Sequence, residues 1–188
     1  MDQVAERYVA ALDEIDTHMR AIRDDQWTAS TPCTEWNVRD LVDHIVYETL
    51  WVPDLLDGMT LEQVGDRYED DRLGSDPLAA WSRAYEAARA SALLDDALVG
   101  TVHTSGGETS ALDYMSEMLA DAVIHGWDLA QGIGGTWTID PATAVDLLDW
   151  YEPFAERMRG YGAMADPVEV APDADAATRL IAMSGRTP

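Results

Sequence analysis

Residues 38–56 read VRDLVDHIVYETLWVPDLL, and their apolar side chains recur at helical spacing. Leu41, His44, Glu48, Trp51 and Leu55 follow one another at steps of three and four, so all five lie on one face of a helix. The other members of that face are apolar, so we expect it to point into a protein interior. The segment therefore predicts a buried helix face that carries a histidine and a carboxylate.

Helical spacing extends over most of the chain. Helix starts are indicated by Asn37, by Asp76 before Pro77, by Ser110 with Asp113 three positions later, and by Asp140 before Pro141. The predicted helices span residues 4–22, 38–56, 77–94, 110–132, 141–160 and 175–183. We expect a connection with one helical turn over 59–75 and a small hairpin over 97–110, because the latter contains adjacent glycines. The pattern predicts an all-α bundle.

The length of 188 residues fits one domain with a sizeable core. No apolar run approaches the length of a membrane span, and the first residues do not form a basic start followed by an apolar stretch. Cys33 is the only cysteine, so no internal disulfide can form. These features predict a cytoplasmic protein without a signal peptide.

The net charge is −24, from 36 acidic residues against 12 basic ones, all of which are arginine. Such a surface repels nucleic acids and anionic membranes, so we expect neither as a partner. A salt-adapted or high-GC source would produce this bias, and a functional acidic patch is the alternative. The expected partner is a small-molecule substrate.

A second helix face repeats the polar pattern of the first. Met118, Asp121, His125 and Asp128 follow at steps of three and four within the predicted helix 110–132. Buried ionised carboxylates cost several kcal/mol each unless they are paired or bind a cation. A metal ion between the two faces would offset that cost. A hydrogen-bonded core histidine and an ordinary surface acid pair remain alternatives for each face.

The candidate ligands favour certain metals. Imidazole and carboxylate suit zinc, nickel, iron or manganese, and three protein ligands with an open position are typical of a catalytic zinc site. We expect the other histidines, His18 and His103, to be surface residues, and Cys33 to be a buried structural thiol. Gly132, Gly134 and Gly135 follow a helix rather than a strand, so they do not form a phosphate loop.

Three stretches carry a family resemblance. They are TPCTEWNVRDLVDH at 31–44, DAVIHGWDLA at 121–130, and DADAATRL at 173–180 with Gly185 and Arg186. The chain resembles the DinB-like superfamily, in the actinobacterial branch related to the N-terminal metal-binding domain of mycothiol-dependent maleylpyruvate isomerase.

The resemblance implies a DinB-like four-helix bundle with an extra C-terminal helix and tail. Residues 1–160 would form the metal-binding bundle, and 161–188 an extension packed on it. The implied ligands of a zinc or nickel ion are His44, Asp121 and His125. The isomerase has glutamate where this chain has Asp121, so Glu48 and Asp128 remain candidates for a third ligand or a hydrogen-bonding partner.

The resemblance also implies thiol chemistry. The expected function is that of a divalent-metal-binding protein acting as a metal-dependent S-transferase or isomerase on a small molecule, with mycothiol or a similar thiol as cofactor. The isomerase carries a further C-terminal domain, so we do not expect its specific reaction here. Alternatives are a non-catalytic metal-binding or small-molecule-binding bundle and a purely structural helical protein. The sequence assigns no catalytic residue and leaves a homodimer open.

Overall fold

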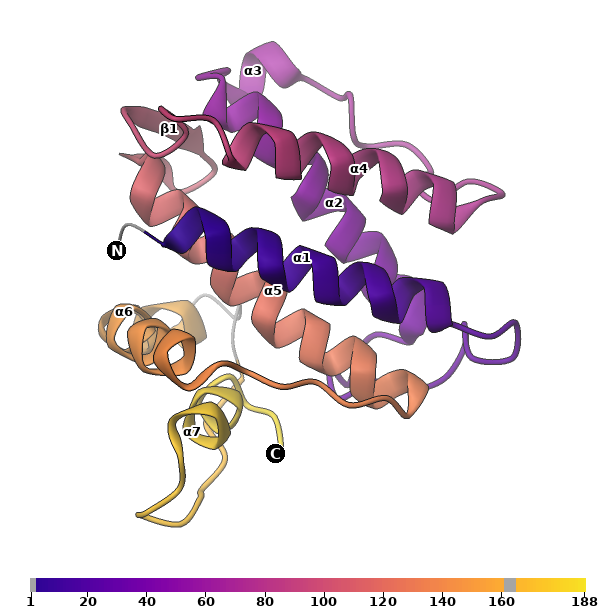
Figure 1. The fold of residues 1–188 in the computed structure, drawn as a ribbon, viewed down its shortest axis with the longest axis vertical. Helices are drawn as coiled ribbons and strands as arrows, with labels where there is room; N and C mark the ends of the chain where they lie inside the picture. Colours follow the sequence, from indigo (N-terminus) through magenta and orange to yellow (C-terminus); the bar gives the residue numbers. More distant parts are fainter. Residues whose placement is uncertain (1–2, 161–164) are drawn as a thin grey trace. The chain divides into compact units, whose positions relative to one another are not determined.

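The computed structural model describes residues 3–160 and 165–188, and it is mostly helical, as predicted (Figure 1). The described residues form seven helices and one two-stranded sheet. Among them, no helix combines the length and apolar character needed to cross a membrane. The elements are α1 (Val4–Ala21), α2 (Val38–Leu56), α3 (Leu61–Val64), α4 (Pro77–Ala92), β1 (Thr101–Thr104), β2 (Gly107–Ser110), α5 (Ala111–Ile133), α6 (Pro141–Gly160) and α7 (Ala176–Met183).

Contacts divide the chain into two compact units after Gly135. The first unit contains α1 to α5, and the second contains α6 and α7. Helix α6 packs on α7 within the second unit, and the assignment of residues 1–160 to one bundle stays a prediction. The packing of an extension 161–188 on the bundle stays a prediction, and residues 161–164 of it lie outside the described residues.

The predicted helix starts are confirmed by their caps. The side chain of Asn37 accepts hydrogen bonds from the N–H groups of Arg39 and Asp40, and Asp40 returns a bond to the Asn37 N–H. Asp76 and Ser110 cap α4 and α5 through the N–H groups three positions later. These caps satisfy N–H groups that have no partner within the helix, so they fix where each helix begins.

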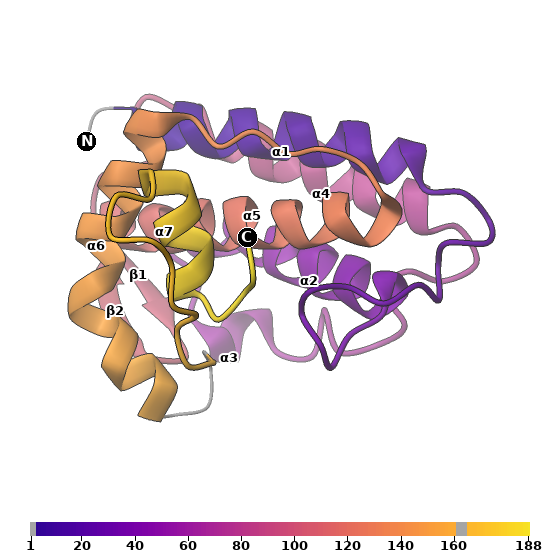
Figure 2. The same cartoon turned by 90° about the horizontal axis from the view of Figure 1, so that it is seen from below.

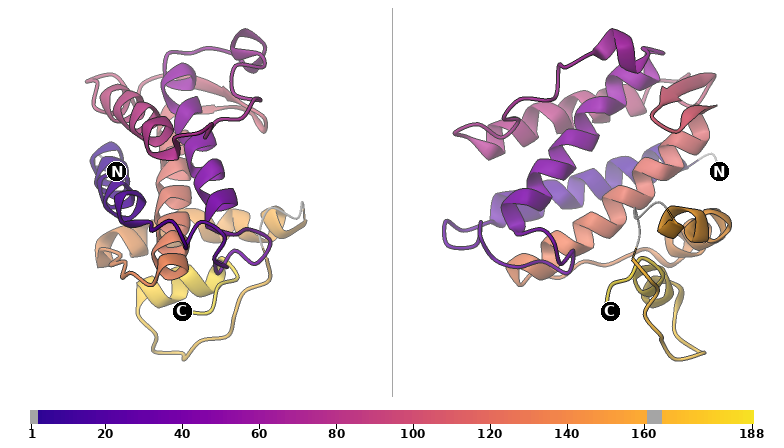
Figure 3. Two further views of the ribbon diagram at one scale, coloured as in Figure 1. Left: turned by 90° about the vertical axis from the view of Figure 1, so that its right-hand side faces the viewer. Right: turned by 180° about the vertical axis from the view of Figure 1, so that it is seen from behind.

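Four long helices build the core of the first unit. Helix α1 packs on α4 and α5, and α2 packs on the same two helices, as Figures 2 and 3 show from other sides. The fully buried side chains include Trp81 of α4, Ile15 of α1, Leu41 of α2 and Leu119 of α5. Trp81 also donates its indole N–H to Asp16 of α1 at 3.0 Å. This residue therefore links two helices by both packing and a hydrogen bond.

The predicted hairpin and helical turn lie beside this core. Strands β1 and β2 pair antiparallel, with Thr101 opposite Ser110 and Thr104 opposite Gly107. Strand β1 contacts both α2 and α5, and α3 supplies the one expected turn of helix before α4. The hairpin leads directly into α5, because Ser110 is both its last residue and the N-cap of that helix.

The second unit is small and is held by its own contacts. Helix α6 contains Pro153 and packs on α7. The guanidinium of Arg159 donates to the carbonyls of Ala165 and Met183 at 3.2 and 3.1 Å. The N–H of Val168 donates to the carbonyl of Ala182 at 2.9 Å. These bonds tie the segment before α7 to both helices of the unit.

One sequence prediction about a side chain is wrong. His18 was expected at the surface, but it is 9% exposed, and one ring nitrogen lies 2.9 Å from the carbonyl oxygen of Glu14. The chain after α5 covers it, because a Cβ at Gly135 would lie 3.2 Å from the His18 ring. His18 thus belongs to the packed contact between α1 and the end of α5.

We predict that Trp81→Ala lowers the free energy of unfolding by about 3–5 kcal/mol, since it removes a fully buried aromatic side chain. Urea denaturation of the full chain measures this change. The control is Leu94→Ala, because Leu94 is 61% exposed and its truncation should change stability by less than about 0.5 kcal/mol. Equal losses for the two variants would contradict the assignment of Trp81 to the core.

Candidate metal centre

Helix α2 directs His44 toward α5. The capping box at Asn37 fixes the first turn of α2, and Val38, Leu41 and Ile45 of this helix are buried. His44 lies beside this buried face and keeps 22% of its side chain exposed. The predicted buried face of α2 is therefore confirmed, and it is partly exposed at His44.

The loop before α2 is closed by its own hydrogen bonds. The N–H groups of Val38 and Arg39 donate to the carbonyls of Ala29 and Trp27, and the Thr31 hydroxyl oxygen lies 2.8 Å from the carbonyl oxygen of Trp36. These bonds hold the Trp36 ring against the candidate site. Its centroid lies 4.6 Å from that of His44 and 5.6 Å from that of His125.

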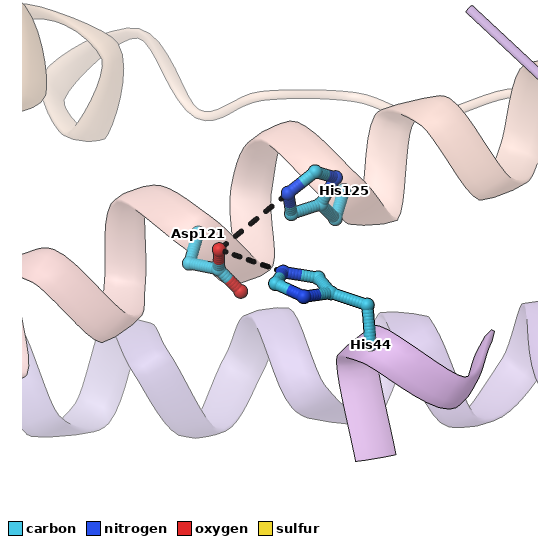
Figure 4. Close-up of side chains that lie close together, drawn as sticks. All are labelled: His44, Asp121 and His125. Atoms are coloured by element: carbon cyan, nitrogen blue, oxygen red, sulfur yellow. Dashed lines mark hydrogen bonds and ion pairs between the residues drawn. The ribbon is translucent and has the colours of Figure 1, made fainter. Parts of the chain in front are cut away.

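Helix α5 contributes the other two residues. Asp121 and His125 are one turn apart, so their side chains project from the same side of α5. Asp121 Oδ1 lies 3.4 Å from His44 Nε2 and 3.5 Å from His125 Nε2 (Figure 4). The two imidazole rings meet edge to face, with centroids 4.7 Å apart. One carboxylate oxygen is thus shared between two histidines from different helices.

This arrangement can hold a metal ion. One ligand atom from each of His44, Asp121 and His125 lies within 4.8 Å of the others. Ligands about 2.1 Å from a tetrahedral ion lie about 3.4 Å from one another, which matches the two nitrogen–oxygen distances. Nitrogen and carboxylate oxygen donors suit zinc or nickel, as expected from the residue types. The residues present therefore fit a divalent cation.

Asp128 contacts the far side of His125. Its Oδ2 lies 3.1 Å from His125 Nδ1, and its side chain is completely buried. A carboxylate only accepts, so this contact makes Nδ1 the donor and leaves the Nε2 lone pair directed at Asp121 and His44. Carboxylates often orient metal-binding histidines in this way. Of the two roles left open for Asp128, the geometry fits the hydrogen-bonding partner.

The surroundings of the cluster are acidic and partly desolvated. Burial lowers the pKa of His44, but its hydrogen bond to Asp121 and the charges of Asp121, Glu48 and Asp43 outweigh burial and raise it. Burial and the charge of Asp121 raise the pKa of Glu117, and burial raises the pKa of Tyr8 above its ordinary range. The carboxylates thus attract positive charge, and burial penalises each one that is ionised.

The structure places the other candidates around this cluster. Glu48 lies one turn beyond His44 on α2, and among the described residues it is not part of the group whose atoms can converge on one ion. Cys33 is half-buried in the loop before α2, without a disulfide. His103 lies on β1 beside Glu108 and keeps 34% of its side chain exposed. That the cluster binds a metal stays a prediction.

Three residues near the site are not among those predicted from the sequence. Trp36 was noted only as part of the motif, although its ring contacts both histidines. Tyr8 of α1 and Glu117 of α5 were given no role, yet the charge of Asp121 acts on both. The position of Glu117 one turn before Asp121 in the sequence could have indicated that it lies near the site. Nothing in the local sequence of α1 indicates that Tyr8 lies near α5.

We predict that Glu48→Gln stabilises the metal-free protein at alkaline pH. Burial and the charge of Asp121 raise the pKa of Glu48 to about 7 from 4.5, so the folded chain holds this proton where the unfolded chain has lost it. Stability therefore falls as the pH rises through this window. Near pH 8 the variant should gain on the order of 1–3 kcal/mol over the wild type, and near pH 4 nothing.

Urea denaturation in chelator across this pH range measures the difference. Glu6→Gln is the matched control, because Glu6 is exposed on α1 and its replacement should leave the pH profile unchanged. A stability difference between wild type and Glu48→Gln that does not vary with pH would contradict the burial of this carboxyl.

Two curated relatives come from Mycobacterium tuberculosis, strains H37Rv and CDC 1551/Oshkosh, and both are described as uncharacterized proteins. Each is 27% identical to this chain over 198 residues, which cover 94% of this chain and 99% of the relative. No solved structure matches the chain. These relatives share its length but assign it no reaction.

A family described as the mycothiol maleylpyruvate isomerase N-terminal domain matches residues 8–130. The match includes α2 and α5 up to Ala130, and with them His44, Asp121, His125 and Asp128. It covers most of the first unit, and the DinB-like superfamily is consistent with it. The chain therefore belongs to the family of the mycothiol maleylpyruvate isomerase N-terminal domain.

Proposed function

We propose that this protein binds a divalent metal ion through His44, Asp121 and His125, and that it is a thiol-dependent S-transferase or isomerase acting on a small molecule. The convergence of these three side chains from α2 and α5 carries the proposal. The family suggests mycothiol or a similar thiol as the cofactor, and it suggests that α1, α2, α4 and α5 form a DinB-like four-helix bundle. The cytoplasm and a homodimer stay predictions from the sequence.

Each residue of the site would have a distinct task. His44 and His125 would supply neutral nitrogen ligands, and Asp121 would supply an anionic oxygen. Asp128 would keep His125 in the tautomer with a free Nε2, and Trp36 would exclude water from one side of both rings. A zinc or nickel ion held there would lower the pKa of a coordinated thiol, which is the nucleophile of such reactions.

The side chain proposed as the third ligand is shorter here than in the isomerase. The shorter Asp121 stands where the isomerase has glutamate, but its Oδ1 lies at similar distances from both histidine nitrogens. The aspartate oxygen can therefore lie beside both histidine ligands of one ion. This supports Asp121, rather than Glu48 or Asp128, as the third ligand.

The first test is elemental analysis of the purified full chain. We expect about one zinc or nickel ion per chain in the wild type, and less than about a tenth of that in His44→Ala and His125→Ala, because each loses one of three ligands. His103→Ala is the matched control, since His103 lies on β1 outside the cluster, and it should keep its metal. Wild-type protein that cannot be loaded with zinc or nickel would contradict the proposal.

The second test concerns the reaction. We expect the metal-loaded chain to accelerate conjugation of mycothiol to chlorodinitrobenzene at least about tenfold over the metal-free chain, since a lowered thiol pKa supplies more thiolate. In the conjugation, a sulfur–carbon bond forms and chloride leaves. Product formation is followed by absorbance and mass spectrometry. Metal binding without acceleration of this conjugation would favour the non-catalytic binding protein.

A further inference from the structure

A pocket of about 380 Å³ lies one helical turn from the candidate metal centre. Its walls come from α2, α3, the β hairpin and α5, all within the first unit. Glu48 follows His44 by one turn on α2, and Glu117 precedes Asp121 by one turn on α5, so the two helices that hold the cluster also line the pocket. A volume of this size falls within the range of small-molecule pockets, roughly 300–1,000 Å³.

Where the side chains that line this pocket are charged, the charge is negative. Glu48, Glu69 and Glu117 line it, and no arginine or histidine is among its lining residues in the described chain. The nearby Arg72 and Arg67 are engaged elsewhere, because Arg72 pairs with Asp43 and Arg67 pairs with Asp54. An anionic ligand would therefore meet repulsion without a cationic partner in the wall. A dicarboxylate such as maleylpyruvate does not suit this pocket.

The rest of the wall is aromatic and apolar. Tyr47, Trp51 and Tyr114 contribute rings, and Leu55 and Met118 contribute aliphatic surface. Rings of this kind attract organic cations through the negative face of the π system. Such a wall suits a ligand with an apolar body rather than a bare inorganic ion.

Two polar groups of the wall lack partners. Among the described residues, the indole nitrogen of Trp51 and the hydroxyl of Tyr114 are buried without a hydrogen bond, and Tyr114 is only 3% exposed. Both atoms are inaccessible from the pocket, so a ligand there would contact the rings of these residues and not their polar atoms.

We propose that this pocket binds a small organic cation, an amine with an aromatic or apolar body. Its ammonium group lies beside Glu48 and Glu117, and its body packs on Trp51 and Tyr114. The inference rests on the proposed function in one respect: the pocket adjoins the metal cluster, so the amine is the substrate of that centre. It names a substrate class that the family's own name does not suggest.

The test is isothermal titration calorimetry of the full chain, both zinc-loaded and chelator-treated. The probes are phenethylamine, tyramine and tryptamine, each compared with the carboxylate of the same body, such as p-hydroxyphenylpropionate for tyramine. We expect at least one amine to bind with a Kd below about 1 mM and at least about tenfold more tightly than its carboxylate. Failure of all three amines, or equal binding of a matched carboxylate, overturns the proposal.

Variants of the pocket residues then test where the amine binds. Glu48→Gln and Glu117→Gln keep the side-chain shape but remove the charge, and each should weaken amine binding at least about tenfold. Glu6→Gln is the control for general attraction to an acidic protein, because it removes an equal charge from the exposed face of α1. Equal losses in Glu6→Gln and the pocket variants overturn the site.

The outcome of the amine titrations can be distinguished from the outcome of the metal analysis. If the wild type holds metal through His44 and His125 but binds no amine, the pocket proposal fails and the metal-binding function stands. If amines bind in a Glu48-dependent way to protein that never takes up metal, the pocket stands and the proposed metal function fails.

Discussion

The close approach of α2 and α5 is the constraint on which the candidate site depends. His44 and Asp121 are 77 positions apart, so only this packing brings them together. A Cβ at Gly132 would lie 3.1 Å from Thr31 Cγ2 and 3.2 Å from Val38 Cγ2, so the bare glycine lets the end of α5 approach the start of α2. The same loop presents Trp36 to both histidine rings. Helix contact, loop and cluster thus form one structural unit.

This contact encloses more charge than a helical core ordinarily holds. Asp128 is completely buried, and Asp121 and His125 keep 26% and 12% of their side chains exposed. Burying such groups without a counter-charge costs several kcal/mol, and replacing them with apolar residues would often be neutral or stabilising. This free-energy cost is explained if these residues bind a ligand.

Local signals in the sequence predicted the helices well, because caps and apolar spacing act over a few residues. Asn37, Asp76 and Ser110 mark the starts of α2, α4 and α5 as predicted. Spacing also placed His44 and His125 on core-directed faces, but it did not say whether Asp121, Glu48 or Asp128 would complete the cluster. That choice depends on the rotation and distance between two helices, which are tertiary quantities. His18 was misjudged for the same reason, since the segment that covers it is distant in the chain.

The charges of the metal site and the charges of the pocket can be considered separately. A divalent ion brings two positive charges, Asp121 and Asp128 bring two negative ones, and the neutral imidazoles add none. The metal centre would therefore balance its own charge without Glu48 or Glu117. These two carboxyls line the pocket, and burial raises the pKa of each in the metal-free protein, so their ionisation costs free energy there. A ligand that carries positive charge offsets this cost, whereas a neutral or anionic ligand does not. The electrostatics of the pocket thus support the proposed amine as its ligand.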